Sequence, residues 1–310
     1  MAGYAAVKLG YKNLGFLGGM AVPAVQRYGY GFVQGVDAAA AELKLTDVKL
    51  NYAYGNQFSG DADITAAMDT WYAGGTEVVF ACGGGIYTSA VDAAKKVEGA
   101  KVIGVDVDQA GVIANYAAGE GADAATIEGY KALTVTSAMK GLYPATYDTL
   151  TDVIVNGNWE KYSAKIDTLG LVSADDPTAN YVQIPMESTQ WADGAFTQDD
   201  YKALVKALFD GTVTVSNDIT KAASDFATVI TVEDLGNIKV IMNKNTIFKI
   251  FFKELFFTYR LGKIESLNVF TTHMLKEIKL FYVLNAFCYY IHTKQLRHID
   301  NSRHHISCFL

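Results

Sequence analysis

Short apolar runs alternate with longer amphipathic segments along the first half of the chain. The runs have strand length, and between the first two, Tyr28 and Phe32 are four residues apart and share one helix face, which we expect to pack on a sheet. This alternation predicts a doubly wound α/β fold whose parallel sheet is covered on both faces. The predicted strands are residues 14–19, 48–54, 78–81, 102–105 and 133–139.

Proline and capping residues indicate where the helices begin. Pro23 suits the first turn of a helix over 24–43, and Asp61 the N-cap of a helix that ends near Tyr72. Thr197, followed by two aspartates, predicts another N-cap. The remaining expectations are a helix over 144–155 and a loop-rich segment over 156–196, whereas the small residues of 110–129 are too irregular in pattern to assign an element.

The charge changes sign near residue 238. Residues 1–238 carry 15 Lys+Arg against 29 Asp+Glu, a balance of −14, whereas residues 239–310 carry 11 against 4, a balance of +7. All five histidines and two of the three cysteines lie beyond residue 238. With one cysteine and no histidine, the acidic part cannot assemble a Cys/His metal site or a His-activated nucleophile, and its charge disfavours nucleic acid. We expect no enzyme, no cofactor and no metal.

The segment 241–310 is basic and rich in Phe, Lys and Ile, and it allows two interpretations. Residues 247–257 have the composition of a basic amphipathic helix for a membrane surface or a partner. The abrupt change in charge, histidine and glycine content favours non-native or irregular sequence joined to the domain. The opening residues also lack the basic leader and apolar core of a secretion signal.

Glycines and carboxylates follow two neighbouring apolar runs. Gly83, Gly84 and Gly85 follow the run 78–81, and Asp106 and Asp108 follow the run 102–105. Ligands of wound parallel sheets bind beyond the carboxyl ends of the strands. We therefore expect these residues to lie together along that edge of the sheet, which we call the rim. The glycines permit close backbone approach to a ligand, although a tight turn explains them equally well, and they lack the lysine of a phosphate loop.

Five motifs follow one another along the chain: Gly15-Phe-Leu-Gly-Gly-Met20 with Pro23, Tyr54-Gly-Asn-Gln-Phe58, Cys82-Gly-Gly-Gly85, Ile103-Gly-Val-Asp-Val-Asp-Gln109 and Thr136-Ser-Ala-Met-Lys140. Together they resemble the basic membrane protein family, the PnrA-like substrate-binding lipoproteins of bacterial ABC transporters. The resemblance implies a type 1 periplasmic-binding-protein fold and a purine nucleoside or similar small solute held between two lobes. It also implies ABC permease subunits as partners and an extracytoplasmic, lipid-anchored location.

The chain departs from the family at both ends. Family members begin with a lipoprotein signal and a first lobe, and this sequence resembles them only from the second lobe onward. We therefore expect an incomplete first lobe, with half of the cleft absent. In this interpretation residues 1–140 form the ligand-binding lobe, 141–240 the remainder of that lobe with return and hinge segments, and 241–310 the unrelated tail.

The resemblance directs attention to polar groups at the strand ends. Asp106 is expected to accept hydrogen bonds from neighbouring ribose hydroxyls, the alternative being a capping or solvated carboxylate. Asp108 is the weaker candidate, because it is placed to cap the next segment. Lys140 either donates to a sugar hydroxyl, pairs with Asp106 or is a plain surface lysine. Gln109 is expected to hold one of the two aspartates in position.

Aromatic residues supply the remaining candidates. Phe58 lies in a polar loop after a strand, where it either stacks on a base or plugs the space under the loop. Met20 and Tyr87 occupy similar positions and rank lower, and Trp191 faces the cleft or seals the lobe.

Two other classes of function are weighed against a transport receptor. A sensory or regulatory module could use the same fold to bind a ligand without transport. A nucleotide-dependent enzyme is disfavoured, because the sequence has neither a phosphate loop nor a GxGxxG motif.

Overall fold

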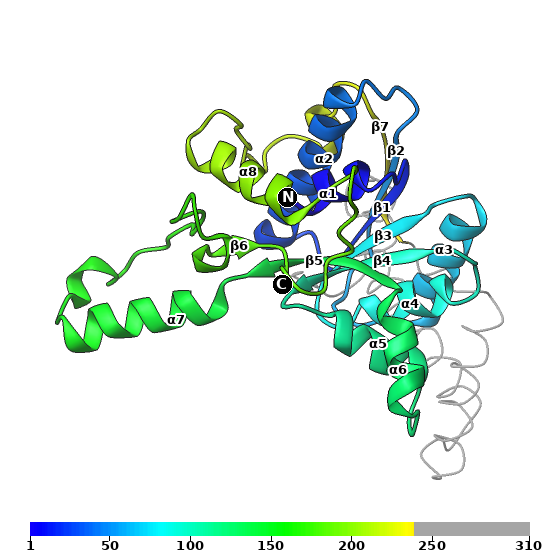
Figure 1. The fold of residues 1–310 in the computed structure, drawn as a ribbon, viewed down its shortest axis with the longest axis horizontal. Coiled ribbons are helices and arrows are strands. Elements are labelled where there is room, and N and C mark those ends of the chain that lie inside the picture. Colours follow the sequence, from blue (N-terminus) through cyan, green and yellow to red (C-terminus); the bar gives the residue numbers. More distant parts are fainter. Residues whose placement is uncertain (239–310) are drawn as a thin grey trace, which may run out of the picture. The chain divides into compact units, whose positions relative to one another are not determined.

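The computed structural model describes residues 1–238. Their centre is a seven-stranded sheet with the strand order β6-β5-β4-β3-β1-β2-β7, and helices cover both of its faces (Figure 1). The strands are β1 (Asn13–Gly18), β2 (Lys49–Tyr54), β3 (Val78–Cys82), β4 (Lys101–Asp106), β5 (Thr134–Lys140), β6 (Val182–Gln183) and β7 (Thr231–Asn237). The α-helices are α1 (Ala2–Lys8), α2 (Pro23–Glu42), α3 (Ala62–Ala73), α4 (Tyr87–Ala94), α5 (Ala110–Ala118), α6 (Ala124–Lys131), α7 (Leu142–Leu150) and α8 (Gln198–Phe209).

The strand pairing confirms the doubly wound α/β fold. β1 is parallel to both β2 and β3, so that Phe16 is opposite Tyr52 on one side and Phe80 on the other. β4 and β5 continue the parallel sheet beyond β3, and β7 extends it beyond β2. The chain therefore changes direction across the sheet between β1 and β3, which is where such folds bind ligands. β6 pairs antiparallel with β5 and makes the sheet mixed at that edge.

Two apolar layers hold the helices to the sheet. On one face α1 and α2 pack over Phe16 and Phe80, and the ring centroids of Phe32 and Phe80 are 5.1 Å apart. The ring centroid of Tyr28 is 6.2 Å from that of Phe80, so the predicted shared face of α2 is confirmed. On the other face α3, α4 and α5 cover the sheet through residues such as Met68 and Ile113.

The sequence pattern does not predict α1, α5, α6 or β7. The segment 110–129, to which the sequence pattern assigns no element, contains α5 and most of α6. The small residues Ala114 and Ala117 are buried and let α5 lie close to its neighbours. α1 was missed for the same reason, since Ala5 and Ala6 supply its buried face. β7 was missed because it is mostly exposed and joins the sheet through backbone pairing with β2.

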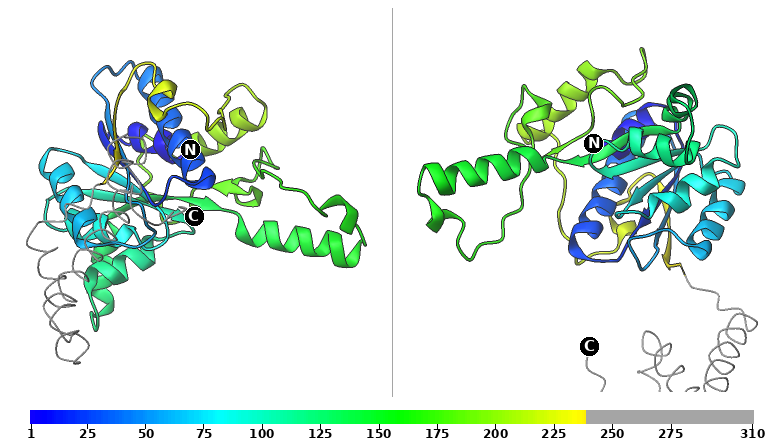
Figure 2. Two further views of the ribbon diagram at one scale, coloured as in Figure 1. Left: turned by 180° about the vertical axis from the view of Figure 1, so that it is seen from behind. Right: turned by 90° about the horizontal axis from the view of Figure 1, so that it is seen from below.

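The region after β5 differs in part from its prediction. The helix expected over 144–155 begins at Leu142, is α-helical to Leu150 and continues as one π-helical turn over Thr151–Val155. Figures 1 and 2 show α7 extending away from the sheet edge. The loop-rich segment contains β6, and Trp191 lies within its return path. The Trp191 indole N–H donates to the Met186 carbonyl at 2.7 Å, and its ring packs on Phe196 and Tyr201, so it seals the core.

The predicted helix starts are confirmed at Asp61 and Thr197. The Asp61 carboxylate accepts from the Ile64 N–H at 2.8 Å, and Thr197 forms a capping box with Asp200. The tail of residues 241–310, with the amphipathic helix predicted over 247–257, lies outside the described residues. Within residues 1–238, no helix has both the length and the apolar character needed to span a bilayer.

Candidate functional site

Three loops meet at the carboxyl ends of β1, β2 and β3, at the point where the winding reverses. The Gly19 N–H donates to the Cys82 carbonyl at 2.9 Å, and the Asn56 N–H donates to the Gly19 carbonyl at 3.0 Å. The Gly85 N–H donates to the Phe58 carbonyl at 2.7 Å. These backbone bonds hold the three loops against one another. We call the surface that Gly19, Asn56 and Gly83 to Gly85 form together the floor of the site.

The ring of Phe58 lies on this floor and is 42% exposed. A Cβ on Gly19 would lie 2.5 Å from the ring atom Cδ1, and a Cβ on Gly83 would lie 3.1 Å from it. Glycine at both positions therefore lets the ring rest directly on two backbone turns. The ring closes the space between the loops and still presents aromatic surface to solvent, so it is available for stacking.

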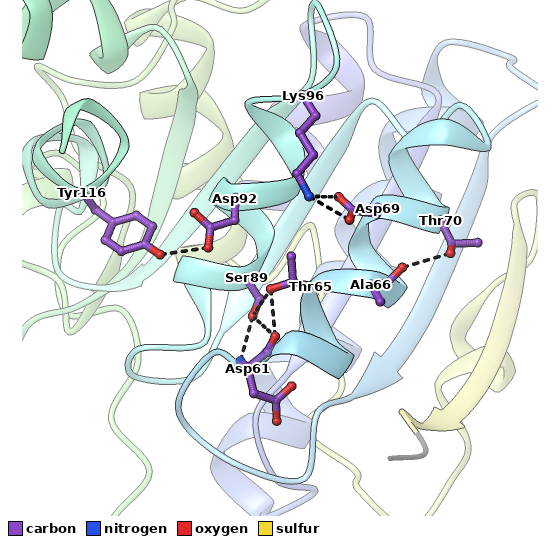
Figure 3. A network of polar contacts seen from close by, with 9 residues as sticks. All are labelled: Asp61, Thr65, Ala66, Asp69, Thr70, Ser89, Asp92, Lys96 and Tyr116. Atoms are coloured by element: carbon purple, nitrogen blue, oxygen red, sulfur yellow. Dashed lines mark hydrogen bonds and ion pairs between the residues drawn. The ribbon is translucent and has the colours of Figure 1, made fainter. Parts of the chain in front are cut away.

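A polar network attaches the loop that carries Phe58 to the helices behind it (Figure 3). The backbone N–H of Asp61 lies 3.0 Å from Oγ of Ser89, a buried residue of α4. The ammonium of Lys96, in the turn just after α4, contacts both carboxylate oxygens of Asp69 on α3 at 2.8 Å. The loop conformation is therefore set by α3 and α4 as well as by its own glycines.

The three consecutive glycines serve mainly to make a tight turn. Gly84 has φ of +49°, a left-handed conformation that favours glycine, whereas Gly83 is needed for its close approach to Gly19. The N–H of Gly85 already donates to the Phe58 carbonyl, and α4 begins only at Tyr87, after the three glycines. Gly84 is the exposed member of the three.

Asp106 and Lys140 form an ion pair at the ends of β4 and β5. The Lys140 Nζ lies 2.7 Å from Oδ1 of Asp106, and each side chain is 41% exposed. The same Nζ is 5.4 Å from the ring centroid of Tyr28 on α2, within cation–π range. A half-exposed pair contributes about 0–1 kcal/mol to stability, so its loss should change the stability of the fold little.

Asp108 and Gln109 have different roles from Asp106. The Asp108 carboxylate accepts from the Ala110 N–H at 3.1 Å at the start of α5, in agreement with the capping alternative. Gln109 is buried and hydrogen-bonds into β4 and β5. Of the two aspartates, Asp106 is the one that forms an ion pair, whereas Asp108 is exposed and bonds only the start of α5.

Neutral groups lie beside the ion pair. Burial, with a smaller effect of the neighbouring Asp106 carboxylate, raises the pKa of the Cys82 thiol and of the Tyr28 hydroxyl above their ordinary values. Both groups are thus uncharged at neutral pH. The Tyr28 hydroxyl is buried and has no hydrogen-bond partner among the described residues. Sequence analysis missed this neighbour of Lys140, because the spacing from Phe32 indicated only packing.

The residues on this rim are ordered by the strands that carry them. Lys140 is the last residue of β5 and Asp106 is the last residue of the neighbouring strand β4. Phe58 lies over the turns after β1 and β3. β4 is next to β3 and two strands from β1, and neighbouring strands are about 4.8 Å apart, so the backbone at Asp106 lies about one to two strand spacings from the turns under Phe58. The rim can therefore contact an elongated molecule with a flat ring at one end and hydroxyl groups at the other.

A family model for the ABC transporter substrate-binding protein PnrA-like family matches residues 1–183. The chain belongs to this family. The match includes every strand from β1 to β5 and each of the rim residues described above. Members of the family are substrate-binding proteins of ABC transporters, a class of binding proteins.

Two named bacterial proteins are similar to part of this chain. The chain is 34% identical over 117 residues to the ABC transporter nucleoside-binding protein BmpA of Lactococcus lactis, covering 35% of this chain and 32% of that protein. It is 30% identical over 175 residues to Basic membrane protein B of Borreliella burgdorferi, covering 55% and 44% respectively. The chain thus spans less than half the length of either relative.

A solved structure of an ABC transporter solute-binding protein from Conexibacter woesei is also similar. It has a TM-score of 0.45 and 21% sequence identity, and the match covers 69% of this chain and 61% of that chain.

Proposed function

We propose that this chain forms one wall of a binding site for a purine nucleoside, or a closely related solute, in the receptor of an ABC transporter. The observation that carries the proposal is the separation of two kinds of group along one rim. A half-exposed aromatic ring lies at the winding reversal, and a half-exposed carboxylate paired with a lysine lies one to two strands away. A base and a ribose present matching chemistry at similar separation.

The proposed roles follow from the chemistry of each group. Phe58 stacks on the base, and Asp106 accepts hydrogen bonds from the ribose hydroxyls. Lys140 holds the carboxylate in place and donates to a sugar oxygen. Gly83, Gly84 and Gly85 shape the floor between them, and Asp108 supports the turn rather than the ligand.

Membership of the family supports a role for the proposed receptor in a transport system. Its partners would be ABC permease subunits, and its location extracytoplasmic, held at the membrane by a lipid anchor. The nucleoside-binding relative in Lactococcus lactis supports the ligand class, and the membership shown by the family model supports the transport role.

The test is calorimetry and thermal unfolding of the full chain with inosine, guanosine and adenosine, and with ribose and amino acids for comparison. A nucleoside that binds the folded state raises Tm as its concentration increases. At a concentration of 100 times Kd it adds about 2.7 kcal/mol to the free energy of unfolding. If no nucleoside shifts Tm at millimolar concentration, while a sugar or an amino acid does, the ligand class is wrong.

Variants at the two ends of the site separate the roles. Replacing Phe58 by Ala removes the stacking surface, which is worth about 1–3 kcal/mol per base, or roughly 5- to 150-fold in Kd. Asp106→Asn is expected to weaken inosine about 10- to 100-fold, because charged hydrogen bonds contribute about 1.5–3 kcal/mol. The control Asp108→Asn is expected to change Kd little.

An analogue tests the contact with ribose directly. 2′,3′-Dideoxyinosine lacks the hydroxyls that Asp106 is proposed to accept from, so the wild-type chain should bind it more weakly than inosine. The Asp106→Asn variant should discriminate much less between the two compounds. Equal discrimination by both proteins would assign the hydroxyls to another residue.

A further inference from the structure

Asp106 has an unusual backbone conformation. Its φ is +67°, in the left-handed region, and the N–H of Val107 donates to the Val105 carbonyl at 2.8 Å. A bond that spans a single residue of positive φ defines the rarer form of γ-turn, which is strained for any residue with a side chain. Such strain persists only where the surroundings impose it.

The side chain of Gln109 reaches back to this turn. Its Oε1 accepts from the Val105 N–H at 2.8 Å, and its own backbone N–H donates to Oγ of Ser137 on β5 at 3.1 Å. β3 and β4 are paired only as far as Phe80 and Ile103. Gln109 therefore supplies the hydrogen-bond partner for Val105 beyond the end of that ladder.

Gly104 makes room for this arrangement. A Cβ at position 104 would lie 2.7 Å from Oγ of Ser137 and 2.8 Å from Cβ of Gln109. Gln109 is 8% exposed and Ser137 is fully buried. Gln109, whose side chain bonds Val105 and whose backbone N–H bonds the Ser137 hydroxyl, thus forms with Ser137 a packed clamp at the end of β4.

We infer that Gln109 is a positioning residue, which with Ser137 holds Asp106 in the strained γ-turn and so directs its carboxylate toward Lys140 and the rim. Without the clamp the backbone at Asp106 relaxes and its carboxylate moves. The effect on ligand binding rests on the proposed function, whereas the clamp itself does not.

An ordinary structural role for Gln109 makes a different prediction. If Gln109 only satisfies the buried N–H of Val105, its replacement has the same effect on stability whatever residue occupies position 106. If it imposes the left-handed conformation, its effect depends on whether residue 106 tolerates positive φ.

The test compares Asp106→Gly with Asp106→Ala in the full chain, once with Gln109 and once with Gln109→Met. Both substitutions remove the carboxylate and its pairing with Lys140, and only glycine accepts positive φ freely. With Gln109 present, Asp106→Gly should melt about 2–4 °C above Asp106→Ala. With Met at position 109 the advantage of glycine should vanish or reverse, because glycine gains more freedom on unfolding.

The inference is overturned if glycine has no advantage with Gln109 present, or keeps the same advantage with Met at position 109. Should Gln109→Met fail to fold, Ser137→Ala takes its place in the same comparison, with the same expected loss of the glycine advantage. Thermal unfolding by circular dichroism is sufficient, so this result does not depend on any ligand.

A binding measurement then tests the consequence for the site. Gln109→Met with Asp106 intact should weaken inosine at least about tenfold, while Val112→Ala, an exposed change on the first turn of α5, should leave Kd unchanged. Unchanged inosine affinity in Gln109→Met would overturn the positioning role. Absence of nucleoside binding by the wild-type chain would instead reject the proposed function, and the melting comparison would still decide the clamp.

Discussion

Asp37 of α2 fastens the segment that leads into β7, and its replacement should release that strand. Its carboxylate is buried, with the residue 7% exposed, and Oδ1 accepts from the N–H groups of Thr228 and Val229, both at 2.8 Å. It also accepts from the Ile230 N–H at 3.2 Å, and Oδ2 accepts from the Thr228 hydroxyl at 2.6 Å. These partners lie about 190 residues away from Asp37 in the sequence.

The expected loss follows from the number of donors left without an acceptor. Asp37→Ala leaves three backbone N–H groups unpaired, each at about 1–3 kcal/mol, so we expect a loss of at least about 3 kcal/mol. For a body of this size that corresponds to roughly 10 °C in Tm. Asp37→Asn keeps one acceptor oxygen and should cost less than Asp37→Ala.

Acid should reduce the contribution of Asp37. Burial acts to raise the pKa of this carboxyl, but hydrogen bonds from Thr228, Val229 and Ile230 together lower it below the ordinary value of 3.8. Because the folded pKa is depressed, the stabilisation is present above the unfolded pKa and is lost as pH falls through the folded pKa. The difference in stability between the wild type and Asp37→Asn should therefore shrink below about pH 4.

Chemical denaturation and hydrogen exchange would measure this effect. The exchange protection of residues 231–237 should fall in Asp37→Ala before that of β1 or β3. The control is Asp47→Ala, which removes an exposed ion pair to Lys12 and should change stability by less than about 1 kcal/mol. The reasoning is refuted if Asp37→Ala is no less stable than Asp47→Ala, or if β7 keeps its protection.

Two further predictions concern α2 and the end of β3. Gly29→Ala should destabilise by about 2 kcal/mol or more, because its Cβ would meet the buried Tyr52 hydroxyl, while Gly31→Ala, with open space around it, should stabilise by about 0.5–1 kcal/mol. Equal melting temperatures for the two variants would contradict this packing. Cys82 should resist a thiol reagent at pH 8 until the chain unfolds, because burial raises its pKa. With both tail cysteines replaced by serine, labelling of the native protein at the rate of the unfolded one would disprove it.

The sequence by itself determined the wound sheet and the rim on which the candidate residues lie. Apolar runs of strand length report burial on both faces, and this local pattern was sufficient to locate β1 to β5. Parallel strands all end at the same side of a sheet, so the positions of Gly83 and Asp106 on one rim followed from the order of elements. Capping residues such as Asp61 were equally local signals.

Only the tertiary structure decided which of these residues act together. The contact of Phe58 with Gly19 and Gly83, and the pairing of Lys140 with Asp106, join residues that are far apart in the sequence and lie at the ends of different strands or in the loops after them. Side-chain direction at a strand end depends on the turn that follows, and at Asp106 that turn is set by Gln109. Periodicity cannot encode these choices, because it records whether a position is buried and not which distant residue covers it.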